Sequence, residues 1–266
     1  MDKELKKNAD RFTGFADTYE NARPIVPKYP IKIILKYLGK MPENVVDLGC
    51  GTGLSTTVWE NYCDRVVGVE PSLDMIKIAK EKESGKITFI NEYASNTGLE
   101  NNYADVVVCS QSFHWMEPEL TLKEINRILK EGGIFSTIDC DWPPLSVWEA
   151  DKAYNDLYDK VKRIEKESPE IKDSFNRYSK EEHLDNITKS GYFTYSREIL
   201  FSNTEKCNAE RYINLILSQG STQVILKKQP HLIGEDIEKF KNIIYKTFED
   251  KEFDIEFYYR MRIAVK

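Results

Sequence analysis

The sequence predicts an α/β fold, a doubly wound and mostly parallel sheet of seven strands with helices on its faces. Between residues 30 and 141, short apolar runs alternate with segments of helical periodicity, which is the pattern of parallel strands joined by crossover helices. A glycine-rich turn follows the first apolar run directly. At the end of the chain, apolar and polar residues alternate strictly, which predicts a long half-buried strand.

The first part of the chain predicts five strands in order, separated by helices. Apolar spacing predicts helices over 31–38, near Val58-Trp59, over 73–82 with Ser72 as N-cap, and over 122–129, the last closed by Gly132-Gly133. The strands that alternate with these helices are predicted over 45–48, 65–70, 87–91, 104–110 and 134–139.

The second part predicts helices that interrupt the sheet before its last strands. Helical patterns cover 146–166, 212–217 and 237–248, and alternation predicts strands over 193–201 and 255–265. We therefore predict three segments: an N-terminal helical cap over 1–30, a cofactor-binding core over 31–142, and 143–266 as a helical lid insertion plus the final two strands of the same sheet.

Composition argues against several classes of protein. The formal net charge of −6 and the isoelectric point near 5.4 disfavour a nucleic-acid partner, because phosphate neutralisation needs a basic face. The longest apolar runs are far below the roughly 18 residues that span a membrane, and the N-terminus lacks the apolar core of a secretory signal. Five widely spaced cysteines form no CxxC pair, which predicts no metal site and a cytoplasmic location.

The glycine-rich turn carries the clearest functional signal. Gly49, Gly51 and Gly53 give the spacing GxGxG, whereas a dinucleotide fingerprint would need its third glycine where Leu54 stands. Such a turn lets the backbone approach a ligand closely at a helix N-terminus. Glu70 ends the second predicted strand, where a carboxylate can accept hydrogen bonds from both hydroxyls of a ribose.

The stretch Asp47-Leu48-Gly49-Cys50-Gly51-Thr52-Gly53 resembles the signature of class I S-adenosylmethionine-dependent methyltransferases. The segments 70–75, 110–115 and 127–133 resemble the ribose-binding turn, the segment after strand four and the helix end of its small-molecule branch, which includes trans-aconitate methyltransferases. The likeness covers about residues 11–142. It implies the Rossmann-like methyltransferase fold and S-adenosyl-L-methionine as cofactor.

The resemblance also implies the residues that bind this cofactor. The family usually has an acidic residue near 93–95 for the adenine amino group, and Tyr93-Ala94-Ser95 stands there instead, so the Ala94 backbone and Ser95 are predicted to take its place. Together with these two, the predicted cofactor-binding residues are Tyr19, Arg23, Asp47, Gly49, Gly51, Gly53, Glu70, Pro71, Met75, Ser110 and Gln111.

Methyl transfer is an in-line displacement at carbon, in which the enzyme positions the acceptor and excludes water. A hydroxyl or amine acceptor benefits from a general base, and His114 is the one histidine within the recognisable site region; the alternative is that it only orients its loop. Four aromatic residues are predicted to line the acceptor pocket: Phe113, Trp115, Trp142 and Tyr212. Trp142 precedes a proline pair after strand five, unlike the motif after strand four of nucleic-acid amine methyltransferases.

We therefore predict methyl transfer to an oxygen, a carboxylate or hydroxyl, of a small metabolite. The alternatives are an N-methyltransferase of a small amine, a protein that holds the cofactor without turnover, and a nicotinamide oxidoreductase, which Leu54 disfavours. The sequence indicates no oligomeric state.

Overall fold

The computed structural model describes residues 23–24, 26–172, 176–249 and 251–266. The chain divides into two compact units, which are described separately. The α/β unit comprises Val26–Cys140, Arg177–Phe201 and Tyr259–Lys266. The helical unit comprises Asp141–Asn176 and Ser202–Tyr258, together with the described residues Arg23 and Pro24. Most of the predicted cap over 1–30 lies outside the described residues, and the predicted division at residues 30 and 142 stays a prediction.

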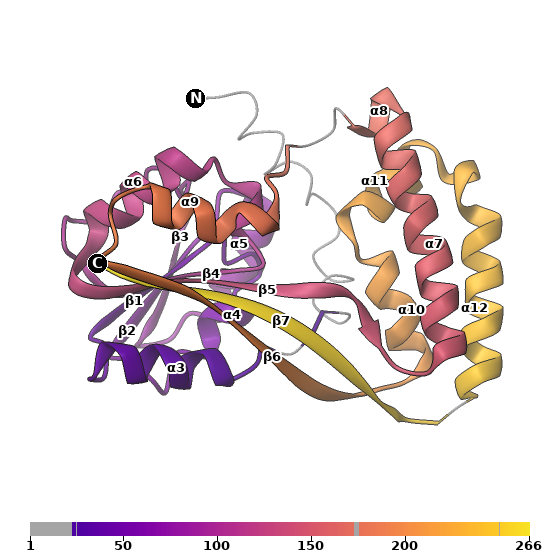
Figure 1. Ribbon diagram of the computed structural model, residues 1–266, viewed down its shortest axis with the longest axis horizontal. Coiled ribbons are helices and arrows are strands. Elements are labelled where there is room, and N and C mark those ends of the chain that lie inside the picture. The colour runs from indigo at the N-terminus through magenta and orange to yellow at the C-terminus, as the bar shows by residue number, and fades with distance from the viewer. Residues whose placement is uncertain (1–22, 25, 173–175, 250) are drawn as a thin grey trace. The chain divides into compact units, whose positions relative to one another are not determined.

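The predicted seven-stranded sheet is confirmed, with the strand order β3-β2-β1-β4-β5-β7-β6 (Figure 1). Its strands are β1 (Asn44–Leu48), β2 (Arg65–Val69), β3 (Ile87–Ile90), β4 (Ala104–Ser110), β5 (Leu129–Leu145), β6 (Tyr195–Cys207) and β7 (Phe253–Val265).

Most of the sheet is parallel, as predicted. β1 pairs in parallel with β2 and with β4, β2 pairs with β3, and β4 pairs with β5. β7 is antiparallel: at its end, Lys266 exchanges 3.1 Å backbone hydrogen bonds with Gly132 and Gly133 near the start of β5. From β1 to β3 successive strands are added on one side of β1, and from β4 onward the strands are added on its other side. The strand order therefore switches between β1 and β4. The carboxyl ends of these two strands are therefore the place where doubly wound sheets bind ligands.

The longer helices of the α/β unit are amphipathic and bury their apolar sides: α3 (Tyr29–Leu38), α5 (Leu73–Lys80) and α6 (Pro118–Ile128). α6 begins where Pro118 takes the first helical position and the Glu117 carboxylate accepts the backbone N–H groups of Glu119 and Leu120, which would otherwise lack partners. The other elements are α4 (Leu54–Thr57), η1 (Phe113–Trp115), η2 (Lys180–Glu182) and α9 (His183–Lys189).

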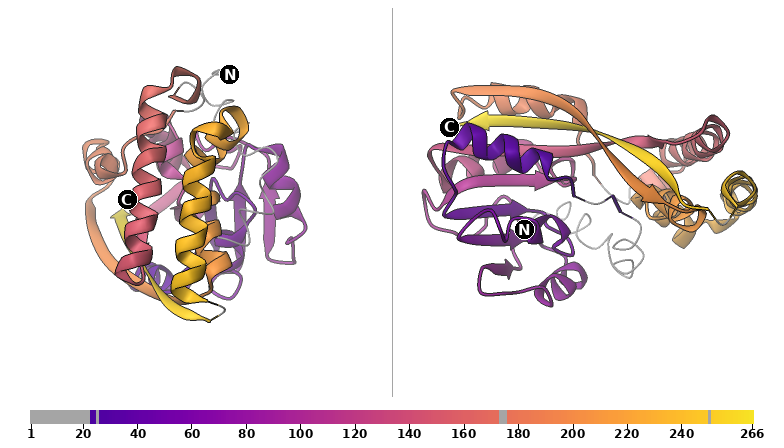
Figure 2. Two further views of the ribbon diagram at one scale, coloured as in Figure 1. Left: turned by 90° about the vertical axis from the view of Figure 1, so that its right-hand side faces the viewer. Right: turned by 90° about the horizontal axis from the view of Figure 1, so that it is seen from below.

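The helical unit has an aromatic core. The rings of Tyr154, Tyr212 and Phe240 pack with centroids 5.7–6.3 Å apart, and all three side chains are buried. α7 and α12 lie side by side in both Figure 1 and the left view of Figure 2. The elements are α7 (Trp148–Glu167), α8 (Pro169–Lys172), α10 (Ala209–Leu217), α11 (Gly220–Lys228), η3 (Pro230–Leu232) and α12 (Gly234–Phe248).

Some predicted boundaries are wrong. Strand five, predicted over 134–139, runs from Leu129 to Leu145, so Trp142 and the proline pair lie inside β5 and not after it. The strand predicted over 193–201 continues to Cys207. Gly132-Gly133 does not end the preceding helix: α6 ends at Ile128, and β5 starts at Leu129 and includes both glycines. The reason is an irregularity in strand pairing, since Ala104 pairs with Leu129 while Val106 pairs with Ile134, and Gly132 takes a left-handed φ of 72° there. No described helix is long and apolar enough to cross a membrane.

Candidate functional site

The glycine-rich turn joins the carboxyl end of β1 to α4. The backbone N–H groups of Gly49 and Cys50 both donate to the Val69 carbonyl, at 2.8 and 3.1 Å, which ties the turn to the end of β2. The Gly53 N–H donates to the Cys50 carbonyl at 2.9 Å and closes the turn. Gly53 then takes the N-cap position of α4.

The three glycines are needed for different reasons. A Cβ added to Gly49 would lie 2.7 Å from atoms of Met116 and Ser112, and one added to Gly53 would lie 2.8 Å from Phe89, so both allow close packing of the protein on itself. A Cβ on Gly51, whose φ is +57°, would meet no atom of the described residues within 4 Å. The space in front of Gly51 is therefore open to a ligand.

Glu70 stands beside this space, immediately after β2. Its carboxylate accepts the Gly51 N–H at 3.0 Å and the Ser72 N–H at 2.8 Å, so it lies against the turn. Burial raises the pKa of Glu70 to about 7, opposed by those two hydrogen bonds from backbone N–H groups. Each carboxylate oxygen keeps a further lone pair that can accept a hydroxyl hydrogen from a ligand.

Asp47, in β1, is buried beneath the turn. One of its oxygens accepts the hydroxyls of Ser55 and Thr56 at 2.6 and 2.7 Å, while the other, Oδ1, is buried without a hydrogen-bond partner among the described residues. Burial raises the pKa of Asp47 to about 6, and the two hydroxyls oppose that rise. An unpartnered buried acceptor fits a ligand that brings a hydrogen-bond donor.

Together these groups fit a nucleoside cofactor with a charged amino-acid tail. The open side of Gly51 leaves room for ligand atoms, and Glu70 offers acceptors for ribose hydroxyls. The spare oxygen of Asp47 accepts hydrogen bonds, as an ammonium group requires. No group of three or more His, Cys, Asp or Glu side chains in the described part of the chain is arranged to hold a metal ion.

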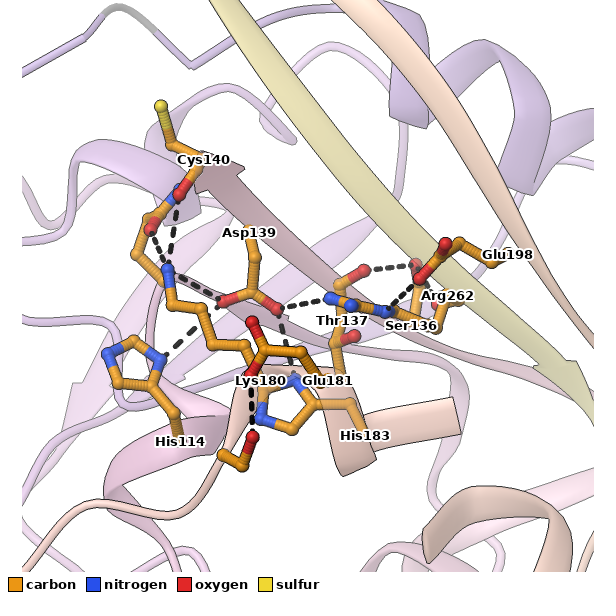
Figure 3. Close-up of polar contacts among 12 residues, drawn as sticks. His114, Ser136, Thr137, Asp139, Cys140, Lys180, Glu181, His183, Glu198 and Arg262 are labelled. Atoms are coloured by element: carbon orange, nitrogen blue, oxygen red, sulfur yellow. Dashed lines mark hydrogen bonds and ion pairs between the residues drawn. The ribbon is translucent and has the colours of Figure 1, made fainter. Parts of the chain in front are cut away.

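A buried polar network adjoins this edge of the sheet, in β5 just past Ile138, the last residue of β5 that pairs with β4 (Figure 3). Its centre is Asp139, which is 1% exposed. One carboxylate oxygen lies 3.0 Å from Nδ1 of His183 and 3.0 Å from Nη1 of Arg262, and the other lies 3.5 Å from both Nδ1 of His114 and Nζ of Lys180.

The network fixes the protonation of its members. Although burial alone would raise the pKa of Asp139, the contacts with His114 and His183 and the charge of Lys180 hold that pKa well below its usual value. Burial lowers the pKa of His114 to about 3, and the contact with Asp139 only partly opposes this. At neutral pH the site therefore contains an ionised Asp139 and a neutral His114.

Residues 46–137 match the family model of the methyltransferase domain. The match covers less than half of the chain and makes this segment similar to methyltransferase domains that use S-adenosylmethionine. The open turn at Gly51 and the acid Glu70 lie inside the matched segment, so the features that fit a cofactor belong to the methyltransferase domain itself.

Known relatives resemble the chain over this domain. The chain is 34% identical over 125 residues to the protein named "Probable S-adenosylmethionine-dependent methyltransferase CRG1" of Saccharomyces cerevisiae. The aligned segment covers 44% of this chain and 43% of that protein. The chain is 32% identical over 123 residues to the uncharacterized methyltransferase Rv3342 of Mycobacterium tuberculosis, covering 46% and 49%. The chain thus matches less than half the length of these curated relatives.

The structural similarity to solved proteins covers more of the chain than the sequence similarity does. A solved structure from Anaeromyxobacter dehalogenans, provisionally described as a type II methyltransferase, has a TM-score of 0.67, covers 91% of this chain and 97% of its own, and is 15% identical. At that identity the comparison demonstrates the fold, including the segments outside the methyltransferase domain.

The structure brings several of the predicted cofactor-binding residues of the methyltransferase domain to the carboxyl edge of the sheet. Ser110 ends β4, and Gln111 follows it with a φ of 56° and donates its N–H to the Ile138 carbonyl at 2.9 Å. Pro71 follows Glu70, and Ala94 and Ser95 lie in the turn after β3. Met75 is 2% exposed and packs in the core from α5.

The predicted aromatic residues divide between the two units. In the α/β unit, Phe113 is buried and its ring packs against His183, while Trp115 lies under the guanidinium of Arg177 at 5.9 Å. In the helical unit, Tyr212 belongs to the aromatic core, and Trp142 lies 5.8 Å from the guanidinium of Arg23. Tyr19 lies outside the described residues.

Sequence reasoning missed the network around Asp139. A carboxylate at the carboxyl end of a predicted strand was the available signal, since that edge of a doubly wound sheet holds ligands. His183 and Arg262 carried no signal, because they lie 44 and 123 residues from Asp139 in the sequence.

Proposed function

We propose that the chain transfers the methyl group of S-adenosylmethionine to a carboxylate oxygen of a small organic acid. The cofactor, when bound, supplies an electrophilic methyl group on a positively charged sulfur. One O–CH₃ bond forms, the S–CH₃ bond breaks, and the neutral thioether leaves. A carboxylate is already the nucleophile, so no proton has to be removed.

The observation that supports this acceptor is the state of His114. Its Nδ1 faces the ionised Asp139 at 3.5 Å, its side chain is only 7% exposed, and its pKa is lowered to about 3. A side chain with so low a pKa is a poor general base near neutral pH, where hydroxyl and amine acceptors would need one. In this proposal His114 orients its turn, and base catalysis remains the alternative role.

The remaining residues bind and position. We assign the ribose hydroxyls to Glu70 and the adenine to Ala94 and Ser95, as the resemblance implies. We assign the methionine end to the turn around Gly51 and, because of its unpartnered oxygen, to Asp47. Rigid placement of both reactants can lower the barrier of a displacement by about 7–11 kcal/mol. The small-carboxylate acceptor also agrees with the resemblance to trans-aconitate methyltransferases, which remains an analogy.

The test begins with calorimetric titration of S-adenosylhomocysteine, with NAD as the control. One-to-one binding of the first alone is expected. A screen with methyl-labelled cofactor against small carboxylic acids, alcohols and amines follows. Methyl esters release labelled methanol in alkali, whereas N-methyl products do not, so an alkali-stable product refutes the carboxylate assignment. Binding without any product favours the non-catalytic alternative.

A further inference from the structure

Lys180 differs from the other groups around Asp139 in its access to solvent. The side chains of His183 and Arg262 are each 1% exposed and that of His114 is 7% exposed, whereas Lys180 is 24% exposed. Of the four groups that contact Asp139, Lys180 is therefore the one whose charge can readily meet a ligand. Figure 3 shows its ammonium group between Asp139 and the main chain of Cys140.

The ammonium group of Lys180 is held loosely. Its Nζ lies 3.2 Å from the Cys140 carbonyl, 3.4 Å from Oε1 of Gln111 and 3.5 Å from Asp139. Charge-assisted hydrogen bonds to oxygen are usually about 2.7–2.9 Å long. Elsewhere in the α/β unit lysines reach that range, as Lys40 does with Asp105 at 2.7 Å. Asp139 lies closer to His183 and Arg262, at 3.0 Å each, than to Lys180 at 3.5 Å. Its carboxylate therefore neutralises the charge of Lys180 incompletely.

The position of Lys180 is that of a ligand-binding residue. Gln111 follows β4, and Cys140 lies in β5 two residues past the last β4–β5 pair, so the ammonium group lies where the parallel pairing of these two strands ends, at the carboxyl end of β4. The backbone of the same segment covers the turn that carries His114, because the Tyr178 N–H donates to the His114 carbonyl at 2.9 Å. Arg177 adds a second cation there, over Trp115.

We propose that Lys180 binds the negatively charged oxygens of the methyl acceptor, with Arg177 adding to the positive field. This inference rests on the proposed function and deepens it, since it names the residue that selects an anionic acceptor. An incoming carboxylate replaces the long contacts to Gln111 and Cys140 with a charge-assisted hydrogen bond. Lys180 is a specificity-determining residue and takes no part in proton transfer.

The experiment measures ligand binding without turnover. Acetate, succinate, propane-1,2,3-tricarboxylate and inorganic phosphate are each titrated calorimetrically in saturating S-adenosylhomocysteine, with propane-1,2,3-tricarboxamide as the uncharged probe. The variants are Lys180→Met and Lys180→Arg. Lys189→Met is the matched control, because it removes a lysine charge from a 76%-exposed side chain of the neighbouring helix α9.

We expect at least one carboxylate to bind and the uncharged probe to fail. Lys180→Met should weaken carboxylate binding roughly 10- to 100-fold, the range for losing a hydrogen bond to a charged group. Lys180→Arg should restore most of it, and Lys189→Met should match the wild type. The affinity for S-adenosylhomocysteine and the unfolding temperature should change little in all three variants, which separates acceptor binding from a merely structural role.

The opposite results overturn the inference in distinct ways. If S-adenosylhomocysteine binds but no carboxylate does, or if phosphate alone binds, the assignment of Lys180 to a carboxylate fails while cofactor binding stands. Equal carboxylate binding by wild type and Lys180→Met also refutes it. If Lys180-dependent carboxylate binding persists in a chain that binds no S-adenosylhomocysteine, the subsite stands and the proposed methyl transfer fails.

Discussion

Gly51→Ala is the sharpest test of the turn, because its consequences for folding and for binding can be separated. The added methyl group meets no atom within 4 Å in the part of the chain that the structure describes, so packing among these residues is unaffected. The left-handed φ of +57° disfavours a residue with a Cβ by about 1–2 kcal/mol. In the presence of cofactor, the same methyl group occupies the space assigned to the ligand. Overpacking of that size costs about 1–3 kcal/mol, which weakens binding about 5- to 150-fold.

The matched control is Gly39→Ala. Gly39 has a φ of +74°, and a Cβ there would also meet no described residue within 4 Å. It caps the C-terminus of α3 on the amino-terminal side of β1, away from the carboxyl edge of the sheet. Both variants should lose similar stability in thermal unfolding, and only Gly51→Ala should lose affinity in calorimetric titration with S-adenosylhomocysteine. Affinity within twofold of wild type for Gly51→Ala would refute the placement of the cofactor in front of this glycine.

Three further changes test the charged groups. Because burial raises the pKa of Glu70 to about 7, its ionised fraction rises about tenfold between pH 6 and 8. Calorimetry should therefore show S-adenosylhomocysteine binding up to about tenfold more tightly at pH 8 than at pH 6. Glu70→Gln should abolish this pH dependence of the affinity. His114→Asn should keep turnover of an acid acceptor within about tenfold, whereas a loss of 10²–10⁴-fold in initial rates would establish a general base. Arg262→Met removes one member of a buried ion pair with Asp139 and should lower the free energy of unfolding by about 3–5 kcal/mol in a denaturant titration. An unchanged midpoint of unfolding would contradict this. The stabilisation due to Asp139 is fully present above its unfolded pKa near 3.8 and is lost as pH falls further, because its folded pKa is lowered.

Local sequence patterns predicted most of the fold. The apolar runs predicted β1, β2, β3 and β4 to within about a residue at each end, because strands buried on both faces need continuous apolar sequence. The glycine spacing marked the open turn at Gly51, since a ligand that approaches the backbone excludes a side chain there. These features depend on neighbours in sequence, and so the sequence reveals them.

Local sequence patterns gave wrong or no predictions where a feature depends on residues that are distant in the sequence. Gly132-Gly133 has the composition of a helix end, but its left-handed residue serves an irregular pairing with β4, which no local pattern records. α9 and α11 were not predicted. α9 has only seven residues, and the buried side of α11 includes Ser221 and Thr222, so it does not form an apolar pattern in the sequence. Arg262 lies in the alternating pattern of β7 at a position that the pattern predicts to face solvent. It is buried, because Asp139 on β5 and Glu198 on β6 neutralise its charge.

The charges around Asp139 link the choice of acceptor to the structure of the fold. A histidine that is buried and kept neutral cannot also be an effective base near pH 7, so the site favours an acceptor that arrives ionised. An ionised acceptor in turn needs a counter-charge when it leaves water. Asp139 directs Arg262 and His183 inward, where they stabilise the sheet, and leaves Lys180 at the accessible side of the network. Burial of His114 therefore suppresses base catalysis, although Asp139 opposes it, and the same network keeps a cation, Lys180, for an anionic acceptor. A site for a neutral hydroxyl or amine would require the reverse arrangement, a more exposed histidine and no spare positive charge.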